Sequence, residues 1–175
     1  CYKLLQFNCC NYPILFVAYN MNKDKKIVIF DLDGTLALID KRRAISTKDN
    51  GKMDWDKFFD PKNIDLDQPN IPVIKTLQMF MDNGFKIVIL SGRSGKTFNA
   101  TTNWLMNNHI MWHQLKMRPE DKHFWPDNKL KQHWLDNDPY IDKDDVFAVF
   151  DDRQQVVDMW RQNGLTTFQV ADGDF

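Results

Sequence analysis

Cysteine is scarce in this chain: there are three among 175 residues, and all of them lie in the first ten positions. The remainder therefore offers neither a disulfide framework nor a cysteine-based zinc site, and we expect a reducing, cytoplasmic setting. Glycine and proline number only 7 each, which excludes a collagen-like or low-complexity chain. No apolar run approaches the roughly 20 residues that span a bilayer, so we expect no membrane segment.

An excess of either charge is also absent. The 23 basic and 24 acidic residues give a net charge of -1, which argues against a chain-wide surface for long nucleic acid but not against a local basic patch. Hydrophobic residues make up 43% and aromatic residues 13%, enough for one buried core. We expect a non-native or poorly ordered leader over residues 1–24 and one domain over residues 25–175.

Three short apolar runs, Ile27–Phe30, Ile87–Leu90 and Val146–Phe150, show no alternation of polar and apolar residues. Such runs are typical of strands buried on both faces of a parallel sheet. Residues 166–170 and 111–117 are expected to add two further strands.

Between these runs, apolar residues recur at spacings of three and four over 71–81, 98–108, 129–135 and 156–160. Strands that alternate with helices in this way predict an α/β fold, a Rossmann-like three-layer sandwich with a mostly parallel sheet and right-handed crossovers.

Residues 36–69 interrupt this alternation and show no clear periodic element. An insertion of this length in a compact domain is usually a lid or a substrate loop, and it is too short for a large cap. Its aromatic residues Trp55, Phe58 and Phe59 suggest that it folds back and buries something. Residues 41–52 carry a net charge of +4, which would suit contacts to phosphates, although the charges alone favour a solvated charged loop.

Polar residues follow the three clearest strands directly. They are Asp31, Asp33, Gly34 and Thr35 after the first, Ser91, Gly92 and Arg93 after the second, and Asp151, Asp152 and Arg153 after the third. The carboxyl ends of parallel strands meet at one edge of a sheet, where ligands bind. Four carboxylates gathered there would repel one another, and a divalent cation that prefers oxygen ligands, most simply Mg²⁺, relieves that repulsion.

The spacing of Asp31 and Asp33 lets both side chains reach the crevice while Leu32 turns into the core, because alternate residues of an extended segment share a face. One carboxylate can then attack phosphorus while the other carries a proton to and from the leaving oxygen.

These motifs resemble those of the haloacid dehalogenase superfamily, and more closely the 3′-phosphatase domain of bacteriophage polynucleotide kinase/phosphatase. The resemblance implies that Asp31 is the nucleophile and Asp33 the general acid and base. It implies that Ser91 and Lys131 hold the phosphoryl oxygens, and that Gly92, Arg93 and Arg42 contact substrate. It also implies that Asp152 binds Mg²⁺ with Asp31 and the main-chain carbonyl of Asp33, with Asp151 alongside.

Two assignments stay open at this point. Lys129 competes with Lys131, which we favour because it lies one turn into the expected helix. The sequence does not show which of the adjacent Arg42 and Arg43 contacts substrate, because both lie on the same predicted loop.

The expected activity is hydrolysis of a phosphomonoester through an aspartyl-phosphate, with a 3′-phosphate on DNA or RNA as the preferred substrate. A nucleotidase or other small-molecule phosphatase of the same superfamily, and a non-catalytic phosphate-binding module, are the alternatives. The sequence does not decide whether the substrate is DNA or RNA, whether its phosphate is at the 3′ or the 5′ position, or what the oligomeric state of the protein is. Residues 94–97 look like the end of a P-loop, but Leu90 stands where that motif needs glycine, so we expect no ATP-driven activity.

Overall fold

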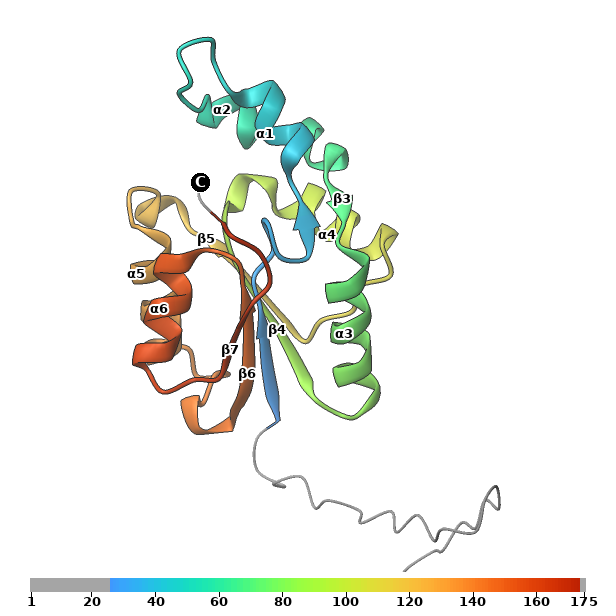
Figure 1. Ribbon diagram of the computed structural model, residues 1–175, viewed down its shortest axis with the longest axis vertical. Helices are drawn as coiled ribbons and strands as arrows, with labels where there is room; N and C mark the ends of the chain where they lie inside the picture. The colour runs from blue at the N-terminus through green and yellow to red at the C-terminus, as the bar shows by residue number, and fades with distance from the viewer. Residues whose placement is uncertain (1–25, 174–175) are drawn as a thin grey trace, which may run out of the picture.

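The centre of the protein is a five-stranded sheet, seen in a computed structural model that describes residues 26–173 (Figure 1). The leader predicted at residues 1–24 lies outside the described residues. All neighbouring strands of this sheet are parallel. In sheet order they are β5 (Gln114–Arg118), β4 (Lys86–Ser94), β1 (Ile27–Phe30), β6 (Val146–Asp151) and β7 (Thr167–Gln169).

Two helices cover each face of the sheet, which confirms the predicted three-layer α/β fold (Figure 1). The helices α3 (Ile71–Asp82) and α4 (Phe98–Asn107) pack on one face, and α5 (Asp127–Asn137) and α6 (Gln154–Gln162) pack on the other.

The residues of β1 divide between two hydrophobic cores. Val28 and Phe30 belong to the core under α3 and α4, whereas Ile27 and Ile29 belong to the core under α5 and α6. This explains why the strand is apolar throughout, because successive side chains of a strand point to opposite faces and both faces are covered.

The edge strand β5 begins at Gln114, three residues later than the sequence predicts. Met111 is exposed, and the five residues of β5 are all only partly buried. An edge strand is covered less completely than a central one, so its sequence shows no continuous apolar run.

The insertion at residues 36–69 is more regular than predicted. It contains a short antiparallel pair, β2 (Ala37–Leu38) with β3 (Gln68–Pro69), two helices, α1 (Asp40–Ser46) and α2 (Trp55–Phe58), and a 3₁₀ helix, η1 (Pro61–Leu66). The helix α1 buries only Arg42 and Ser46, so it carries no apolar stripe that periodicity could reveal. The insertion lies over the carboxyl edge of the sheet (Figure 1). Over residues 26–173, no helix has the length and apolar character needed to cross a membrane.

Candidate active site

Three buried carboxylates meet at the carboxyl edge of the sheet. Asp31 follows β1, Asp151 ends β6, and Asp152 comes directly after it. The parallel register places Phe30 beside Phe150, and the Asp31 amide donates to the Phe150 carbonyl at 2.9 Å. One oxygen from each of Asp31, Asp151 and Asp152 lies within 4.8 Å of the others. The strand ends therefore bring together acidic residues that lie about 120 positions apart in the chain.

Gly34 has little room beside Asp152. It has a φ of +91°, and a Cβ on it would lie 2.2 Å from Oδ2 of Asp152. The neighbouring Thr35 hydroxyl donates to Oδ1 of Asp152 at 3.2 Å. The glycine and threonine after the paired aspartates thus permit the turn and hold the third carboxylate in place.

Lys131 of α5 is the cation of this cluster. Its Nζ donates to Asp31 Oδ1 at 2.5 Å and to Asp151 Oδ2 at 2.7 Å, and the side chain is only 2% exposed. Burial alone would lower the pKa of Lys131, but Asp151 and Asp31 raise it, so the ammonium stays charged. Lys129 is exposed and lines a separate groove between α5 and α6. The geometry therefore places Lys131, rather than Lys129, at the site.

The cluster holds more negative than positive charge. Burial raises the pKa of Asp31 well above its ordinary value, with Asp151 and Asp152 adding to the shift and Lys131 opposing it. Burial and the adjacent Asp151 also raise the pKa of Asp152 to about 6. Three carboxylates against one ammonium leave an excess of two negative charges when all are ionised, which a divalent cation would balance.

The Asp33 carboxylate pairs with two arginines and lines the same cleft as Asp31. Its Oδ1 accepts from Arg42 Nη2 at 2.5 Å and from Arg93 Nε and Nη2 at 2.8 and 2.5 Å. Burial would raise the pKa of Asp33, but Arg93 and Arg42 together lower it below the ordinary range. Its carboxylate is not part of the acidic cluster, and the metal contact through its main-chain carbonyl stays a prediction.

Arg42 and Arg43 occupy different environments on α1. Arg42 is fully buried and reaches Asp33, whereas Arg43 is only partly buried. The helical geometry of α1 separates the two adjacent arginines that the sequence could not distinguish.

The sequence did not indicate Asp67. It lies between η1 and β3, where its Oδ1 accepts from Arg42 Nε at 2.8 Å and its Oδ2 from Arg93 Nη2 at 2.6 Å. Its carbonyl also accepts from Trp104 Nε1 at 3.1 Å. Burial raises the pKa of Asp67 despite the two arginines. No motif surrounds Asp67, and its partners lie 25 and 26 residues away, so only the folded chain reveals it.

The backbone of β4 shapes the middle of the site. The Arg93 amide donates to Ser91 Oγ at 3.2 Å, and the Gly92 carbonyl accepts from Arg118 Nε at 2.9 Å. A Cβ on Gly92 would lie 2.6 Å from Oδ1 of Asp127, so a larger residue here would displace the Asp127 carboxylate. The contact of Ser91 with a phosphoryl oxygen stays a prediction.

A second ion-pair cluster is centred on Asp127, the first residue of α5. Its two oxygens accept from Arg118 Nη2 and from Arg153 Nη1. Arg153, which follows the Asp151–Asp152 pair, thus joins the amino end of the helix that carries Lys131 to the end of β6.

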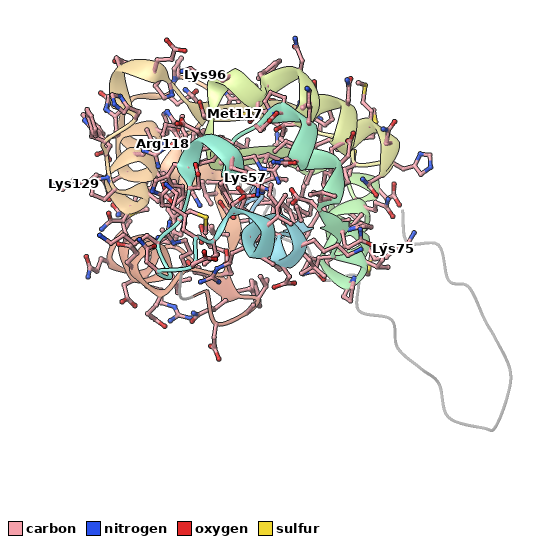
Figure 2. All side chains as sticks on the ribbon, turned by 90° about the horizontal axis from the view of Figure 1, so that it is seen from above. Lys57, Lys75, Lys96, Met117, Arg118 and Lys129 are labelled. Atoms are coloured by element: carbon pink, nitrogen blue, oxygen red, sulfur yellow. The ribbon has the colours of Figure 1, made fainter. Side chains whose placement is uncertain are left out.

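A cleft of about 760 Å³ opens above Asp31 and Asp33. Its walls come from α2, from the start of η2 (Gly95–Thr97), and from the segment that follows η3 (Glu120–Lys122). Figure 2 looks down on this edge of the molecule, with α1 and α2 crossing the centre of the view.

With paired aspartates after β1, a lysine on α5 and an acidic pair at the end of β6, the chain is a phosphatase of the haloacid dehalogenase superfamily, as its family match shows. Residues 25–175 match the family described as the polynucleotide kinase PNKP phosphatase domain. The chain belongs to this family, which confirms the resemblance found in the sequence.

The relatives include a polynucleotide kinase/RNA ligase, a chain of a Pnkp1/Rnl/Hen1 complex and a more distant enzyme of the haloacid dehalogenase family. A protein of Autographa californica nuclear polyhedrosis virus, named as a bifunctional polynucleotide kinase/RNA ligase, is 34% identical over 155 residues, or 86% of this chain and 20% of the relative. A chain of the Pnkp1/Rnl/Hen1 complex is 33% identical with a TM-score of 0.69, over 88% of this chain and 49% of the other. A haloacid dehalogenase family enzyme of Bacteroides thetaiotaomicron, solved with magnesium and inorganic phosphate, shares the fold at 15% identity and a TM-score of 0.55. The match covers 86% of this chain and 96% of the other. The chain thus spans half or less of the first two relatives.

Proposed function

We propose that this phosphatase removes 3′-phosphate from the ends of DNA or RNA, depends on Mg²⁺, and works through an aspartyl-phosphate on Asp31. The observation that carries the proposal is the convergence of the buried Arg42 and Arg93 on Asp33, which lines the cleft together with Asp31 in a chain of this family. Two guanidiniums beside a carboxylate nucleophile suit a phosphate dianion, because guanidinium forks match phosphate oxygens.

The acidic cluster fits a magnesium ion. Its donors are carboxylate oxygens only, they are buried, and they lie close enough to share one cation. Asp31, Asp151 and Asp152 would hold the ion, with the main-chain carbonyl of Asp33 as a further ligand. When bound, Mg²⁺ would neutralise charge on the nucleophile and on the phosphoryl oxygens.

In the first step, an Asp31 oxygen attacks phosphorus in line with the leaving 3′-oxygen. The bond between phosphorus and that oxygen breaks, and Asp33 donates a proton to the departing alkoxide. Lys131, in contact with Asp31, stabilises the charge that develops on the phosphoryl oxygens, and the Ser91 hydroxyl would add a hydrogen bond.

In the second step, Asp33 takes a proton from water, and the resulting nucleophile attacks phosphorus. The bond between phosphorus and Asp31 breaks and inorganic phosphate leaves. The lowered pKa of Asp33 keeps this carboxylate in the ionised form that accepts the proton. To act as an acid in the first step, Asp33 needs a higher pKa. Binding of substrate phosphate to Arg42 and Arg93 would weaken their interaction with the Asp33 carboxylate and so raise its pKa.

A polynucleotide end is favoured over a small metabolite for two reasons. The insertion at residues 36–69 consists of short elements over the edge of the sheet, and the cleft beside it stays open to solvent. The relatives at 33% and 34% identity carry polynucleotide kinase and RNA ligase names or sit in an RNA repair complex. By analogy with these relatives, this chain would assemble with proteins or domains that carry other nucleic-acid repair activities.

End-group analysis tests the proposal. Oligonucleotides carrying 3′- or 5′-phosphate, as DNA and as RNA, are incubated with Mg²⁺ beside free nucleoside monophosphates, and phosphate release is measured. We expect release from 3′-ends, none without divalent cation, and none from Asp31→Asn, whose fold is checked by circular dichroism. Faster release from free nucleotides than from 3′-ends would contradict the proposed substrate, and full activity of Asp31→Asn would contradict the nucleophile.

A further inference from the structure

The chain returns to the acidic pair at the end of β7. Beyond this strand it continues past the carboxyl edge of the sheet, beside the residues that end β6 (Figure 1). The Val170 amide donates to the Asp151 carbonyl at 3.0 Å, and the Gly173 amide donates to the Asp152 carbonyl at 3.1 Å. The Gln169 side chain also donates to the Asp152 carbonyl, from Nε2 at 3.1 Å. Three donors thus fix the backbone that carries the acidic pair.

Gly173 lies so close to Asp152 that it leaves no room for a side chain. A Cβ on Gly173 would lie 2.9 Å from both the main-chain carbonyl carbon and Cγ of Asp152, and closer still to Oδ2. Carbon atoms in contact are ordinarily about 3.5–4.0 Å apart, so a methyl group fits only if one of the two residues moves. The φ of Gly173 lies outside the left-handed region, so the close approach, and not the backbone conformation, favours glycine here.

The Asp152 carboxylate is enclosed by two separate parts of the chain. Gly34 and Thr35, in the turn after β1, contact it from one part: a Cβ on Gly34 would also collide with Oδ2, and the Thr35 hydroxyl donates to Oδ1. Gly173 contacts it from the other, and Asp152 is buried between them. Contacts of this kind around a metal ligand commonly set its orientation and strengthen metal binding.

We propose that Gly173 and Gln169 are positioning residues that orient the Asp152 carboxylate toward the divalent cation. The inference rests on the proposed function, because it requires that Mg²⁺ binds at the acidic cluster. Gly173 acts through the side chain that it lacks, and Gln169 acts through its hydrogen bond to the Asp152 carbonyl. Neither residue lines the cleft above Asp31, so both act through Asp152 and not through substrate.

Melting temperatures at pH 7.5, recorded over a series of Mg²⁺ concentrations without substrate, test the inference. The dependence of the melting temperature on concentration yields an apparent Kd for Mg²⁺. Gly173→Ala should displace the Asp152 carboxylate, so we expect this Kd to rise by about 10- to 100-fold. Gln169→Met keeps the size of the side chain but removes its donor, and we expect a smaller rise, below about tenfold.

Steady-state kinetics on a 3′-phosphorylated oligonucleotide add a second readout. In Gly173→Ala the Mg²⁺ concentration that gives half-maximal activity should rise by the same factor as the Kd. At saturating Mg²⁺, kcat and the KM for the oligonucleotide should stay close to the wild-type values, because the bound cation draws the carboxylate back into place. A residue that served stability alone would lower the melting temperature without Mg²⁺ and leave the Kd for Mg²⁺ unchanged.

Ala171→Ser is the matched control. It adds one heavy atom, as Gly173→Ala does, at an exposed position two residues earlier, and it should leave the Kd for Mg²⁺ unchanged. A double variant shows whether Gly173 acts through Asp152. In the Asp152→Asn background, Gly173→Ala should weaken Mg²⁺ binding no further, because the carboxylate that it displaces is already gone.

The outcomes separate this inference from the proposed function. A wild-type Kd in Gly173→Ala, or losses of affinity that add in the double variant, would overturn the positioning role and leave the proposed function standing. If Gly173→Ala does not fold, Gln169→Met decides, and an unchanged Kd in that variant overturns the role. A wild type whose melting temperature does not respond to Mg²⁺ at any concentration would overturn the proposed magnesium site, and this inference with it.

Discussion

Arg42 and Arg93 reach the same oxygen of Asp33, each through an Nη2 atom 2.5 Å away. One arginine comes from the insertion and the other from the end of β4. Asp67 separates the two guanidiniums by binding one with each of its oxygens. Two buried arginines are thus balanced by two carboxylates and held in place, which would reduce the ordering required if they bind phosphate as we propose.

Asp67→Asn tests this arrangement. The substitution leaves two buried guanidiniums with one carboxylate, so we expect a loss of about 3 kcal/mol in the free energy of unfolding. Displaced arginines should lower kcat/KM for a 3′-phosphorylated oligonucleotide by about 10- to 100-fold. Asp65→Asn, an exposed change two residues earlier, is the control and should alter neither value. Wild-type stability and kinetics in Asp67→Asn would refute the role given to Asp67.

The two adjacent arginines of α1 offer a second comparison. Arg42→Ala removes a contact to Asp33 and one to Asp67, so we expect about a 100-fold loss of kcat/KM and a lower melting temperature. Arg43→Ala, at a partly buried position, should reduce activity by less than about threefold. Steady-state kinetics on one oligonucleotide decides between them, and a larger loss in Arg43→Ala would reverse the assignment.

Contiguous signals in the sequence predicted most of the fold and the acidic cluster. The strands β1, β4 and β6 are apolar because both faces of the sheet are covered, and the polar residues directly after them are forced to one edge. Asp31 and Asp152 therefore meet as expected.

The remaining features depend on tertiary placement. Arg42 and Arg43 differ in which side of α1 they occupy, and only the side with Arg42 is buried. The position of α1 on the rest of the protein decides this, rather than the sequence of the helix itself. Asp67 is one of many aspartates in an insertion without a periodic pattern, and its role comes from partners distant in the chain. The helices of the insertion are too short to show a repeat.

Lys131 and Lys129 form a matched pair on α5. Lys131→Met keeps the length of the side chain but leaves Asp31 and Asp151 without their shared ammonium. We expect a loss of activity of at least about 100-fold and, without divalent cation, a lower melting temperature. Lys129→Met, on the exposed groove between α5 and α6, should behave as the wild type in both measurements. The assignment fails if Lys129→Met is the more damaging substitution.

The raised pKa of Asp152 predicts how stability depends on pH. Its value is about 6 in the folded protein, against an ordinary value of 3.8 that applies to the unfolded chain. Between these values the folded protein keeps a proton that the unfolded chain releases, so rising pH favours unfolding through this interval. Below about pH 4 the group contributes nothing, and above about pH 6 its ionisation costs on the order of 3 kcal/mol of stability.

A bound divalent cation would favour the ionised form of Asp152, so its stabilising effect should grow across the same interval. We therefore expect the rise in melting temperature on adding Mg²⁺ to be several degrees at pH 7.5 and close to zero at pH 4.5. Asp152→Asn cannot ionise at this position, and in that variant both the rise and its dependence on pH should shrink. Thermal denaturation from pH 4.5 to 7.5, with and without Mg²⁺, measures this directly. An equal Mg²⁺ effect at both pH values, or an unchanged effect in Asp152→Asn, would show that Asp152 does not hold the cation.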